Sequence, residues 1–379
     1  MLKQFYDKLK AYPVILMFFV FLFSFAVFDA IYPKRAFSEL ENRPLAQNPP
    51  INFADIATNK WMIDYEKYVK DQIIFRDSWI DIKSRCEGMV LKTENNGVWY
   101  GKDNMLFQKL ISINNKQLLK NTEFLSDFAL QHEGMVSVMI VPSASLIYND
   151  KLPFAAPMAD ENAALDEIFS ELTNNNATVY DLRKTFTAHK DDGLYFRNDH
   201  HWNANGAYLA YSEYAAHNNL VLFDMQNHKV NKIEKFYGTN YSKSRYPKAV
   251  ADDILFYELP YTIDIHKLDA ANTVTNMPIY NEEKWQTRDK YGAYLQGNNG
   301  YSTINGSGSG NVLIVKDSYA NSFIPFLTEN YAKIGIVDLR DTKMSIDELI
   351  SKEKYEKVLF LYNFETFSED NNIWKIKEF

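Results

Sequence analysis

The pattern of apolar and polar positions first separates one long hydrophobic run from the rest of the chain. Residues 13–31 (PVILMFFVFLFSFAVFDAI) are apolar until Asp29 interrupts the run near its end. At about 1.5 Å per helical residue, this length is sufficient to cross a hydrocarbon layer about 30 Å thick. The pattern therefore predicts a membrane-spanning helix close to the start of the chain.

Basic residues on the two sides of this run indicate its orientation. Lys3, Lys8 and Lys10 precede the run, and the positive-inside preference places such residues in the cytoplasm. Lys34 and Arg35, on the far side, weaken this preference. We expect a short cytoplasmic N-terminus and an extracytoplasmic remainder.

A cleaved signal peptide is the alternative to an anchor. A basic start and an apolar centre are common to both, and residues 24–26 (SFA) resemble a small-x-small cleavage site. The apolar run continues past this site and is bulky throughout, which favours the uncleaved anchor.

A polar stretch and then a helical pattern follow the apolar run. Residues 37–50 (FSELENRPLAQNPP) are polar and end in two prolines, which is typical of a stalk or of a strap against a main domain. Between residues 61 and 92, apolar positions recur at helical spacings, which predicts helix with most of these side chains in a core. They include Trp61, Tyr65, Tyr68, Val69, Ile73, Trp79, Ile82 and Met89.

Short apolar runs alternate with helical segments in the rest of the chain. The run at residues 135–142 (MVSVMIVP) ends in proline and predicts a buried strand. Further runs lie at residues 177–182, 312–315, 334–337 and 358–362, and helices are expected at 203–217, 319–331 and 345–355. This alternation predicts an α/β domain with a largely parallel sheet, although residues 220–310 have no clean periodicity.

Composition and charge limit the possible functions. Of the 379 residues, 46% are hydrophobic and 24% charged, as in a folded protein with a substantial core. The net charge of −8, without a local run of Lys and Arg, disfavours nucleic-acid binding. Because Cys86 is the only cysteine, no intramolecular disulfide can form, and stability must come from packing.

Two distant segments carry the residue types of an acyl-transfer site. Residues 198–202 (NDHHW) place an acid two positions from an imidazole, so Asp199 and His201 can point to the same side of an extended segment. Ser318 follows the predicted strand at 311–315, where a strand-to-helix turn could expose its hydroxyl. This pattern predicts Ser318 as nucleophile, His201 as general base and then acid, and Asp199 as the group that fixes the imidazole tautomer.

Simpler interpretations of the same residues remain open. Ser318 could be a helix cap, since its surroundings differ from the Gly-x-Ser-x-Gly elbow of the α/β-hydrolases. Asp199 and His201 could form a structural hydrogen bond. Asp199, His200 and His201 could instead bind a metal, but no second cluster with zinc-ligand spacing is evident, and neighbouring side chains in an extended segment diverge. We therefore expect neither a metal nor a cofactor.

The combined pattern resembles the DHHW family, a branch of the SGNH-hydrolase-like proteins related to the periplasmic alginate O-acetylation proteins. Agreement in both content and order makes this resemblance more specific than a lone serine motif. The matching segments are residues 38–43 (SELENR), 75–77 (FRD), 98–101 (VWYG), 198–202 (NDHHW), 236–238 (FYG) and 316–322 (KDSYANS).

The resemblance implies an SGNH-hydrolase-like (flavodoxin-like) three-layer α/β/α domain that transfers or removes an acetyl group on a carbohydrate. In the alginate relatives the acid and base precede the nucleophile, as Asp199 and His201 precede Ser318 here, whereas the usual SGNH order begins with the nucleophile. Lys316 replaces the glycine of a standard Gly-Asp-Ser block, and Asp199-x-His201 has one residue fewer than Asp-x-x-His.

Because of these departures, several residues are candidates for binding the oxyanion or the substrate. The Ser318 N–H is the first candidate oxyanion donor, and Asn298, which follows a glycine as in other SGNH blocks, is the second. Asn321, one helical turn after Ser318, is the alternative, although it could be an ordinary polar helix residue. Arg340 could line the cleft or be an exposed strand-end arginine. Trp202 adjoins the proposed site and is the candidate for stacking on a sugar.

The expected organisation is an N-terminus with its anchor (1–35), a stalk and helical segment packed on the core (36–130), and a catalytic domain (131–379) with an irregular insertion around 220–310. The expected function is that of a membrane-anchored, extracytoplasmic O-acetyltransferase for an exopolysaccharide or another cell-envelope glycan. The relatives imply a multipass membrane O-acyltransferase as the partner that supplies acetyl groups. A carbohydrate acetylesterase and a non-catalytic glycan-binding or assembly subunit are the alternatives.

Overall fold

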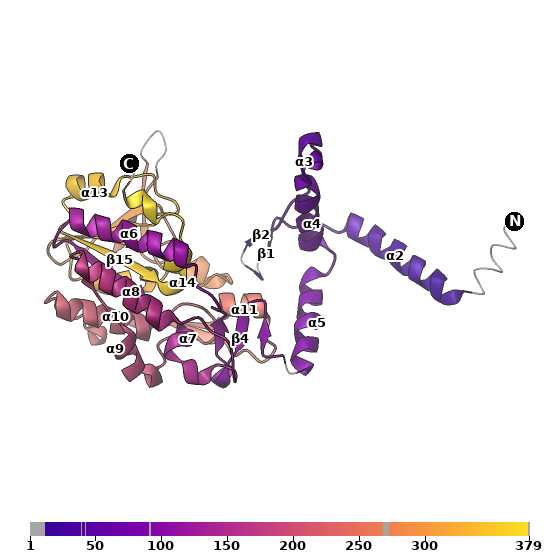
Figure 1. Ribbon diagram of the computed structural model, residues 1–379, viewed down its shortest axis with the longest axis horizontal. Helices are drawn as coiled ribbons and strands as arrows, with labels where there is room; N and C mark the ends of the chain where they lie inside the picture. Colours follow the sequence, from indigo (N-terminus) through magenta and orange to yellow (C-terminus); the bar gives the residue numbers. More distant parts are fainter. Residues whose placement is uncertain (1–11, 39, 42, 91, 268–272, 378–379) are drawn as a thin grey trace. The chain divides into compact units, whose positions relative to one another are not determined.

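The computed structural model describes residues 12–377 apart from 39, 42, 91 and 268–272 (Figure 1). The chain divides into two compact units, Met1–Val90 and Leu91–Phe379. Lys3, Lys8 and Lys10, on which the predicted orientation depends, lie outside the described residues.

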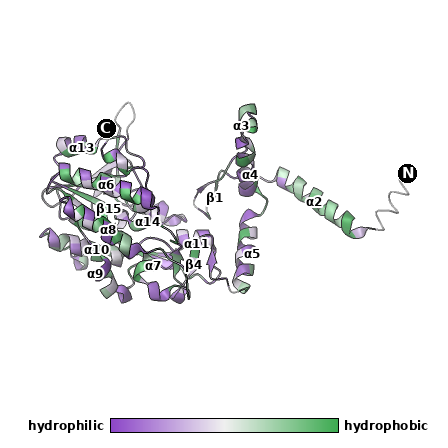
Figure 2. Cartoon of the chain, viewed as in Figure 1, coloured by the Kyte–Doolittle hydropathy of each residue, from purple (hydrophilic) through white to green (hydrophobic). Residues whose placement is uncertain are grey.

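The apolar run of the first unit forms one helix, α2 (Pro13–Ile31), as the sequence predicts. None of its residues is buried, and Figure 2 shows hydrophobic residues along its length. Within the described part of the chain, α2 alone is long and apolar enough to cross a membrane, a property that anchors share with signal sequences. Near its end, Asp29 Oδ1 accepts a hydrogen bond of 2.8 Å from the Ile74 N–H, which ties α2 to the rest of this unit.

Three helices follow α2 in the first unit: α3 (Phe53–Ala57), α4 (Lys60–Gln72) and α5 (Arg76–Met89). The prediction that most apolar side chains here belong to a core is wrong, because this unit has few neighbouring elements to cover them. Tyr65, Val69, Trp79, Ile82 and Met89 are exposed, and the buried apolar side chains among its described residues are Leu45 and Ile74.

Ion pairs hold the first unit together around a short hairpin of β1 (Phe37–Ser38) and β2 (Arg43–Pro44). Arg43 makes two hydrogen bonds to the Asp71 carboxylate, at 2.6 and 2.8 Å. Arg76 lies 2.9 Å from Glu41. The segments at 38–43 and 75–77, far apart in sequence, therefore form one cluster of ion pairs.

The second unit is built on an eight-stranded sheet. Its order is β11 (Val274–Pro278), β10 (Thr262–His266), β12 (Tyr301–Asn305), β14 (Lys333–Val337), β13 (Asn311–Lys316), β15 (Lys357–Asn363), β6 (Val136–Val141) and β7 (Thr178–Val179). The strands from β14 to β7 are parallel, and β12, β10 and β11 continue the sheet antiparallel. The predicted α/β class with a largely parallel core is confirmed.

Alternation along the central strands produces a core on each face of the sheet. In β13, Val312 and Ile314 belong to one apolar cluster, and Leu313 and Val315 to the other. Helix α10 (Ala204–His217) contributes to the first cluster, whereas α6 (Asn115–Gln131), α8 (Glu161–Asn174) and α13 (Ile346–Glu353) contribute to the second. Helices thus cover both faces (Figure 1), which gives three layers.

Shorter elements complete this unit. A three-stranded sheet contains β3 (Glu94–Asn95), β4 (Val98–Tyr100) and β5 (Leu106–Gln108). The remaining helices are α7 (Ala144–Ile147), α9 (Arg183–Ala188), α11 (Thr239–Ser244), α12 (Ala320–Phe323) and α14 (Phe364–Glu369).

Two segments depart from the sequence-based expectation. Residues 220–310 contain a hairpin of β8 (Val230–Phe236) and β9 (Asp252–Tyr257) in addition to β10, β11 and β12. Long-range pairing stabilises these strands, and all of them except β12 are partly exposed, so apolar periodicity alone does not reveal them. The helix expected at 319–331 is only α12 followed by a 3-10 turn, because Pro325 has no N–H to continue α-helical bonding.

Candidate active site

Ser318 lies in the turn between β13 and α12, at the carboxyl end of the central strand. The buried carboxylate of Asp317 holds this turn, since it accepts hydrogen bonds of 2.8 Å from the Tyr319 N–H and from the Asn363 N–H on the neighbouring strand β15. Burial raises the pKa of Asp317, and these two hydrogen bonds oppose that effect. Ser318 is partly exposed between buried neighbours, so the turn presents its hydroxyl.

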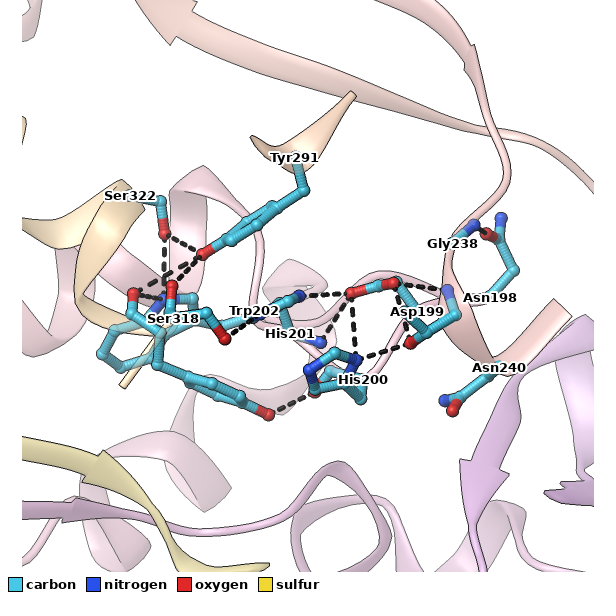
Figure 3. A network of polar contacts seen from close by, with 12 residues as sticks. Asn198, Asp199, His200, His201, Trp202, Gly238, Asn240, Tyr291, Ser318 and Ser322 are labelled. Atoms are coloured by element: carbon cyan, nitrogen blue, oxygen red, sulfur yellow. Dashed lines mark hydrogen bonds and ion pairs between the residues drawn. The ribbon is translucent and has the colours of Figure 1, made fainter. Parts of the chain in front are cut away.

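His201 joins Ser318 to Asp199 across more than a hundred residues of sequence (Figure 3). His201 Nε2 lies 2.7 Å from Ser318 Oγ, and His201 Nδ1 lies 2.5 Å from Asp199 Oδ1. The two contacts use opposite nitrogens of one ring. This geometry matches a nucleophile that contacts a base, which in turn contacts an orienting acid.

The Asp199 carboxylate is held on both oxygens. Oδ1 also accepts the His201 N–H at 2.9 Å, while Oδ2 accepts the N–H and the hydroxyl of Thr239 at 2.7 and 3.1 Å. Burial by itself would raise the pKa of Asp199, but electrostatic interaction with the His200 and His201 rings and these hydrogen bonds outweigh burial and hold the pKa well below its ordinary value. The ionised Asp199 carboxylate can accept a hydrogen bond from the His201 Nδ1–H, an arrangement in which Nε2 faces the Ser318 hydroxyl.

Gly238 allows the chain to approach Asp199 closely. A Cβ at this position would lie 2.1 Å from Asp199 Oδ2, and the Gly238 N–H donates a hydrogen bond of 2.6 Å to Asn198 Oδ1. The 236–238 segment therefore serves to position Asp199. The sequence indicated this segment only as part of the family pattern, because the hydrogen bond from Gly238 to Asn198 joins residues about forty positions apart.

Tyr291 supports the imidazole, and no local sequence signal indicated it. Its ring stacks on that of His201 with centroids 3.8 Å apart and an interplanar angle of 12°. The Tyr291 hydroxyl contacts Ser322 Oγ at 3.0 Å and donates to the Ser318 carbonyl at 3.2 Å (Figure 3). Tyr291 thus connects the base to the turn that carries Ser318.

His200 points away from the serine and contacts Thr239 Oγ1 at 2.5 Å. The ligand atoms of Asp199, His200 and His201 lie within 4.8 Å of one another, so distance alone would allow a cation. Each of these side chains already has a hydrogen-bond partner: Asp199 with Thr239, His201 with Ser318, and His200 with Thr239. The donor set is better matched to proton transfer than to metal binding.

Trp202 does not occupy the position expected of a residue that stacks on a sugar. Trp202 is fully buried, and its Nε1–H donates to the Tyr319 carbonyl at 2.9 Å, so its ring supports the Ser318 turn and is not available to stack on a sugar. Arg340 donates to the buried carboxylate of Asp338 through Nε at 2.8 Å and through Nη2 at 2.5 Å.

Asn298 and Asn321 belong to one polar network with Lys316. Lys316 Nζ donates to Asn298 Oδ1 at 2.9 Å, and Asn321 Nδ2 donates to the same oxygen at 3.1 Å. Because an ammonium can only donate, the oxygen of the Asn298 amide must face Lys316, and its NH2 group points elsewhere. Burial lowers the pKa of Lys316 to about 8, and Asp338, 3.8 Å away, opposes this effect.

The backbone before Asn298 is strained in a way that favours a fixed loop. Leu295, Gln296 and Gly297 all have positive φ, at 55°, 60° and 88°. Such conformations cost free energy for residues other than glycine and persist where surrounding contacts impose them. Asn298 itself is exposed, so the loop presents this residue at the surface.

Comparison with known proteins agrees with the motifs and with the fold. Residues 103–337 match the DHHW protein family. The structure resembles that of a DHHW family protein from Eubacterium siraeum DSM 15702, with a TM-score of 0.65 at 22% identity, over 75% of this chain and 96% of that chain. It also resembles Bacillus cereus PatB1 with a sulfonyl adduct, with a TM-score of 0.58 at 18% identity, over 74% and 97% of the two chains.

A looser similarity extends to the O-acetyltransferase domain of Pseudomonas putida AlgJ, with a TM-score of 0.47 at 13% identity, over 73% of this chain and 93% of that domain. No curated protein matches the sequence significantly. Because the family match covers well over half of the 379 residues and includes both segments of the candidate site, the chain belongs to the DHHW family.

Proposed function

We propose that this protein is a membrane-anchored, extracytoplasmic O-acetyltransferase that modifies an exopolysaccharide or another cell-envelope glycan through an acetyl-serine intermediate. The observation that carries the proposal is the unbroken contact chain from Asp199 through His201 to Ser318. A structural hydrogen bond would explain the first contact, but not the second contact to a partly exposed serine hydroxyl at a strand-to-helix turn.

The proposed reaction has two balanced steps. Ser318 Oγ attacks the carbonyl carbon of an acetyl ester, its proton passes to His201 Nε2, and the leaving alcohol takes that proton as the ester bond breaks. A sugar hydroxyl then attacks the acetyl-serine, gives its proton to His201 Nε2, and Ser318 Oγ recovers a proton as it leaves. Asp199 stabilises the imidazolium in both steps.

Asn298 and Ser318 are the proposed donors for the negative oxygen that develops in each step. The Ser318 N–H has no hydrogen-bond partner among the described residues, and the Asn298 NH2 group is turned away from Lys316. Asn321 supports Asn298 rather than being a separate donor, since its NH2 group is already bonded to Asn298 Oδ1. Fixed donors of this type stabilise an oxyanion without reorganisation.

Three further parts of the proposal, namely the glycan, the acetyl donor and the orientation, are supported by the sequence motifs and by helix α2. The resemblance of the sequence motifs to those of the alginate O-acetylation proteins supports O-acetylation, and helix α2 is suitable as a single-pass anchor. Because acetyl-CoA is confined to the cytoplasm, the acetyl group would reach Ser318 through a multipass membrane O-acyltransferase.

The direct test is mass spectrometry of the protein quenched during turnover of p-nitrophenyl acetate. We expect one acetyl group on Ser318 in the wild type, no adduct in Ser318→Ala, and turnover lower by ~10⁴-fold or more. Acetylated sugar as product identifies a transferase, and acetate alone in the presence of sugars identifies an esterase. Unchanged glycan acetylation in Ser318→Ala would support a non-catalytic subunit instead.

A further inference from the structure

A small pocket lies beside the contacts that join Asp199, His201 and Ser318. His200, Asn240, Tyr319 and Ala144 line it, together with Glu365 of α14. Its free volume is about 20 Å³, which admits one group of the size of a water or hydroxyl and excludes a sugar ring. The rings of His200 and His201 have centroids 3.8 Å apart, so this pocket directly adjoins the proposed base.

The hydrogen bonds around Thr239 determine what His200 offers to this pocket. The Thr239 hydroxyl has one proton, which it donates to the Asp199 carboxylate. The contact from His200 Nδ1 to Thr239 Oγ1 must therefore be a bond that His200 donates. Burial, reinforced by His201, lowers the pKa of His200 to about 3, so the ring is neutral and Nε2 is a bare acceptor.

Asn240 supplies a second acceptor, deeper in the pocket. Its Nδ2 donates to the Leu106 carbonyl at 2.9 Å, which fixes the orientation of the amide. Asn240 Oδ1 is buried without a hydrogen-bond partner among the described residues, and only 2% of the residue is exposed. In Figure 3 the Asn240 side chain points toward His200.

Two acceptors in one small pocket, unpartnered within the residues described, suit a ligand with two neighbouring donors. We propose that one hydroxyl of the carbohydrate acceptor enters the pocket and donates to Asn240 Oδ1, while the adjacent hydroxyl donates to His200 Nε2 at the rim. A vicinal diol of a sugar supplies two neighbouring donors, and only the first hydroxyl needs the enclosed volume. This assignment rests on the proposed function and gives His200, the histidine that the triad does not use, a role in binding.

The charge of the pocket favours a neutral ligand over a cation. Burial, reinforced by Glu161, raises the pKa of Glu365 to about 7, so this carboxyl group is not a fixed negative charge near neutral pH. Ser143 and Ser145 also line the pocket, and their hydroxyls contact each other at 2.9 Å. Such groups both donate and accept hydrogen bonds, as sugar hydroxyls do.

Two variants of the full-length protein test the pocket by different means. Asn240→Leu removes the buried acceptor, together with the hydrogen bond to the Leu106 carbonyl, at similar volume. Ala144→Met fills the pocket without removing a polar group and therefore controls for that loss. The measurements are the burst of p-nitrophenol from p-nitrophenyl acetate, which reports acetyl-enzyme formation, and acetyl transfer to cellopentaose, chitopentaose and pentagalacturonate. Both variants are expected to raise the KM for the sugar about tenfold, whereas the burst rate changes less than twofold.

Ala163→Met, the same substitution at an exposed position of α8, is the matched control and should leave both measurements as in the wild type. Transfer to sugar that neither pocket variant changes would overturn the assignment. So would a wild-type burst with no transfer to any of the three sugars, which would leave the acyl chemistry standing. A wild type without a burst would instead contradict the proposed function itself.

Discussion

The Asp199 carboxylate accepts two hydrogen bonds on each oxygen, and each donor restricts the orientation of the group further. His201 supplies both donors on Oδ1, and Thr239 supplies both on Oδ2. Alternation along an extended segment predicted that Asp199 and His201 face each other. The second pair of donors was not predictable, because Thr239 comes from the start of α11, forty residues later.

Gly238→Ala tests whether this glycine positions Asp199, because the substitution retains the carboxylate itself. The new methyl group would lie 2.1 Å from Asp199 Oδ2 and force the carboxylate to shift, so we expect kcat/KM for p-nitrophenyl acetate to fall about 100-fold. The control is Gly134→Ala, where a Cβ meets nothing within 4 Å but φ is +76°. That control should lose stability and keep activity; wild-type activity in Gly238→Ala would contradict the proposed role.

Lys316 provides a residue-scale test of the Asn298 donor. Asn298→Ala should lower kcat for p-nitrophenyl acetate about 100-fold, as the loss of an oxyanion donor does elsewhere. Lys316→Met should lower kcat less, about tenfold, with little change in KM, because Asn321 still holds Asn298 Oδ1. The double variant should be no slower than Asn298→Ala alone, and additive losses would show that Lys316 acts independently of Asn298.

At the scale of elements, the carboxyl ends of β6, β15 and β13 converge on the site, and the start of α8 supports the first of them. The buried Glu161 carboxylate accepts hydrogen bonds from the N–H and hydroxyl of Ser143, at 2.8 and 2.5 Å, in the turn after β6. Apolar runs in the sequence predicted these parallel strands. The support from α8 follows from the packing of two elements about eighteen residues apart.

Glu161 gives this turn a pH dependence of defined sign. Burial raises the pKa of Glu161 from 4.5 to about 7, so between these values the folded protein keeps a proton that the unfolded chain has lost. The contribution of Glu161 to stability is therefore fully present below about pH 4.5 and is lost as the pH rises through 7. The wild type loses this contribution between pH 5 and pH 8, whereas Glu161→Gln has no proton to lose at this position. The Tm of Glu161→Gln minus the Tm of wild type should therefore increase over this range. Exposed Glu167→Gln on the same helix is the control, and parallel Tm curves for Glu161→Gln and wild type would contradict the prediction.

At the scale of the whole molecule, the two units treat their apolar residues differently. Helix α2 exposes apolar side chains throughout, whereas the unit from Leu91 to Phe379 buries its apolar residues on the two faces of one sheet. Asp29, at the end of α2, is bonded to the backbone of Ile74, which links the apolar helix to the ion-paired cluster that follows it.

The anchor is testable on the intact protein in cells. We expect an uncleaved chain that stays with membranes after alkaline extraction and that external protease degrades, because α2 continues as an apolar helix beyond the small residues at 24–26. The measurements are the mass of the mature protein and its fractionation. A mature chain that begins near residue 27 and is released in soluble form would identify a signal peptide.

Local patterns in the sequence determined the apolar helix, the alternation of strands and helices, and the three residues of the candidate triad. Each of these depends on neighbours within a few positions, through helical rise, strand alternation or the turn after a strand. Only the tertiary structure decided that Gly238 must lack a side chain, that Tyr291 stacks on His201, and that Lys316 and Asn321 orient Asn298. These contacts join segments between 18 and 90 positions apart, and their free energy depends on distances that the folded backbone sets.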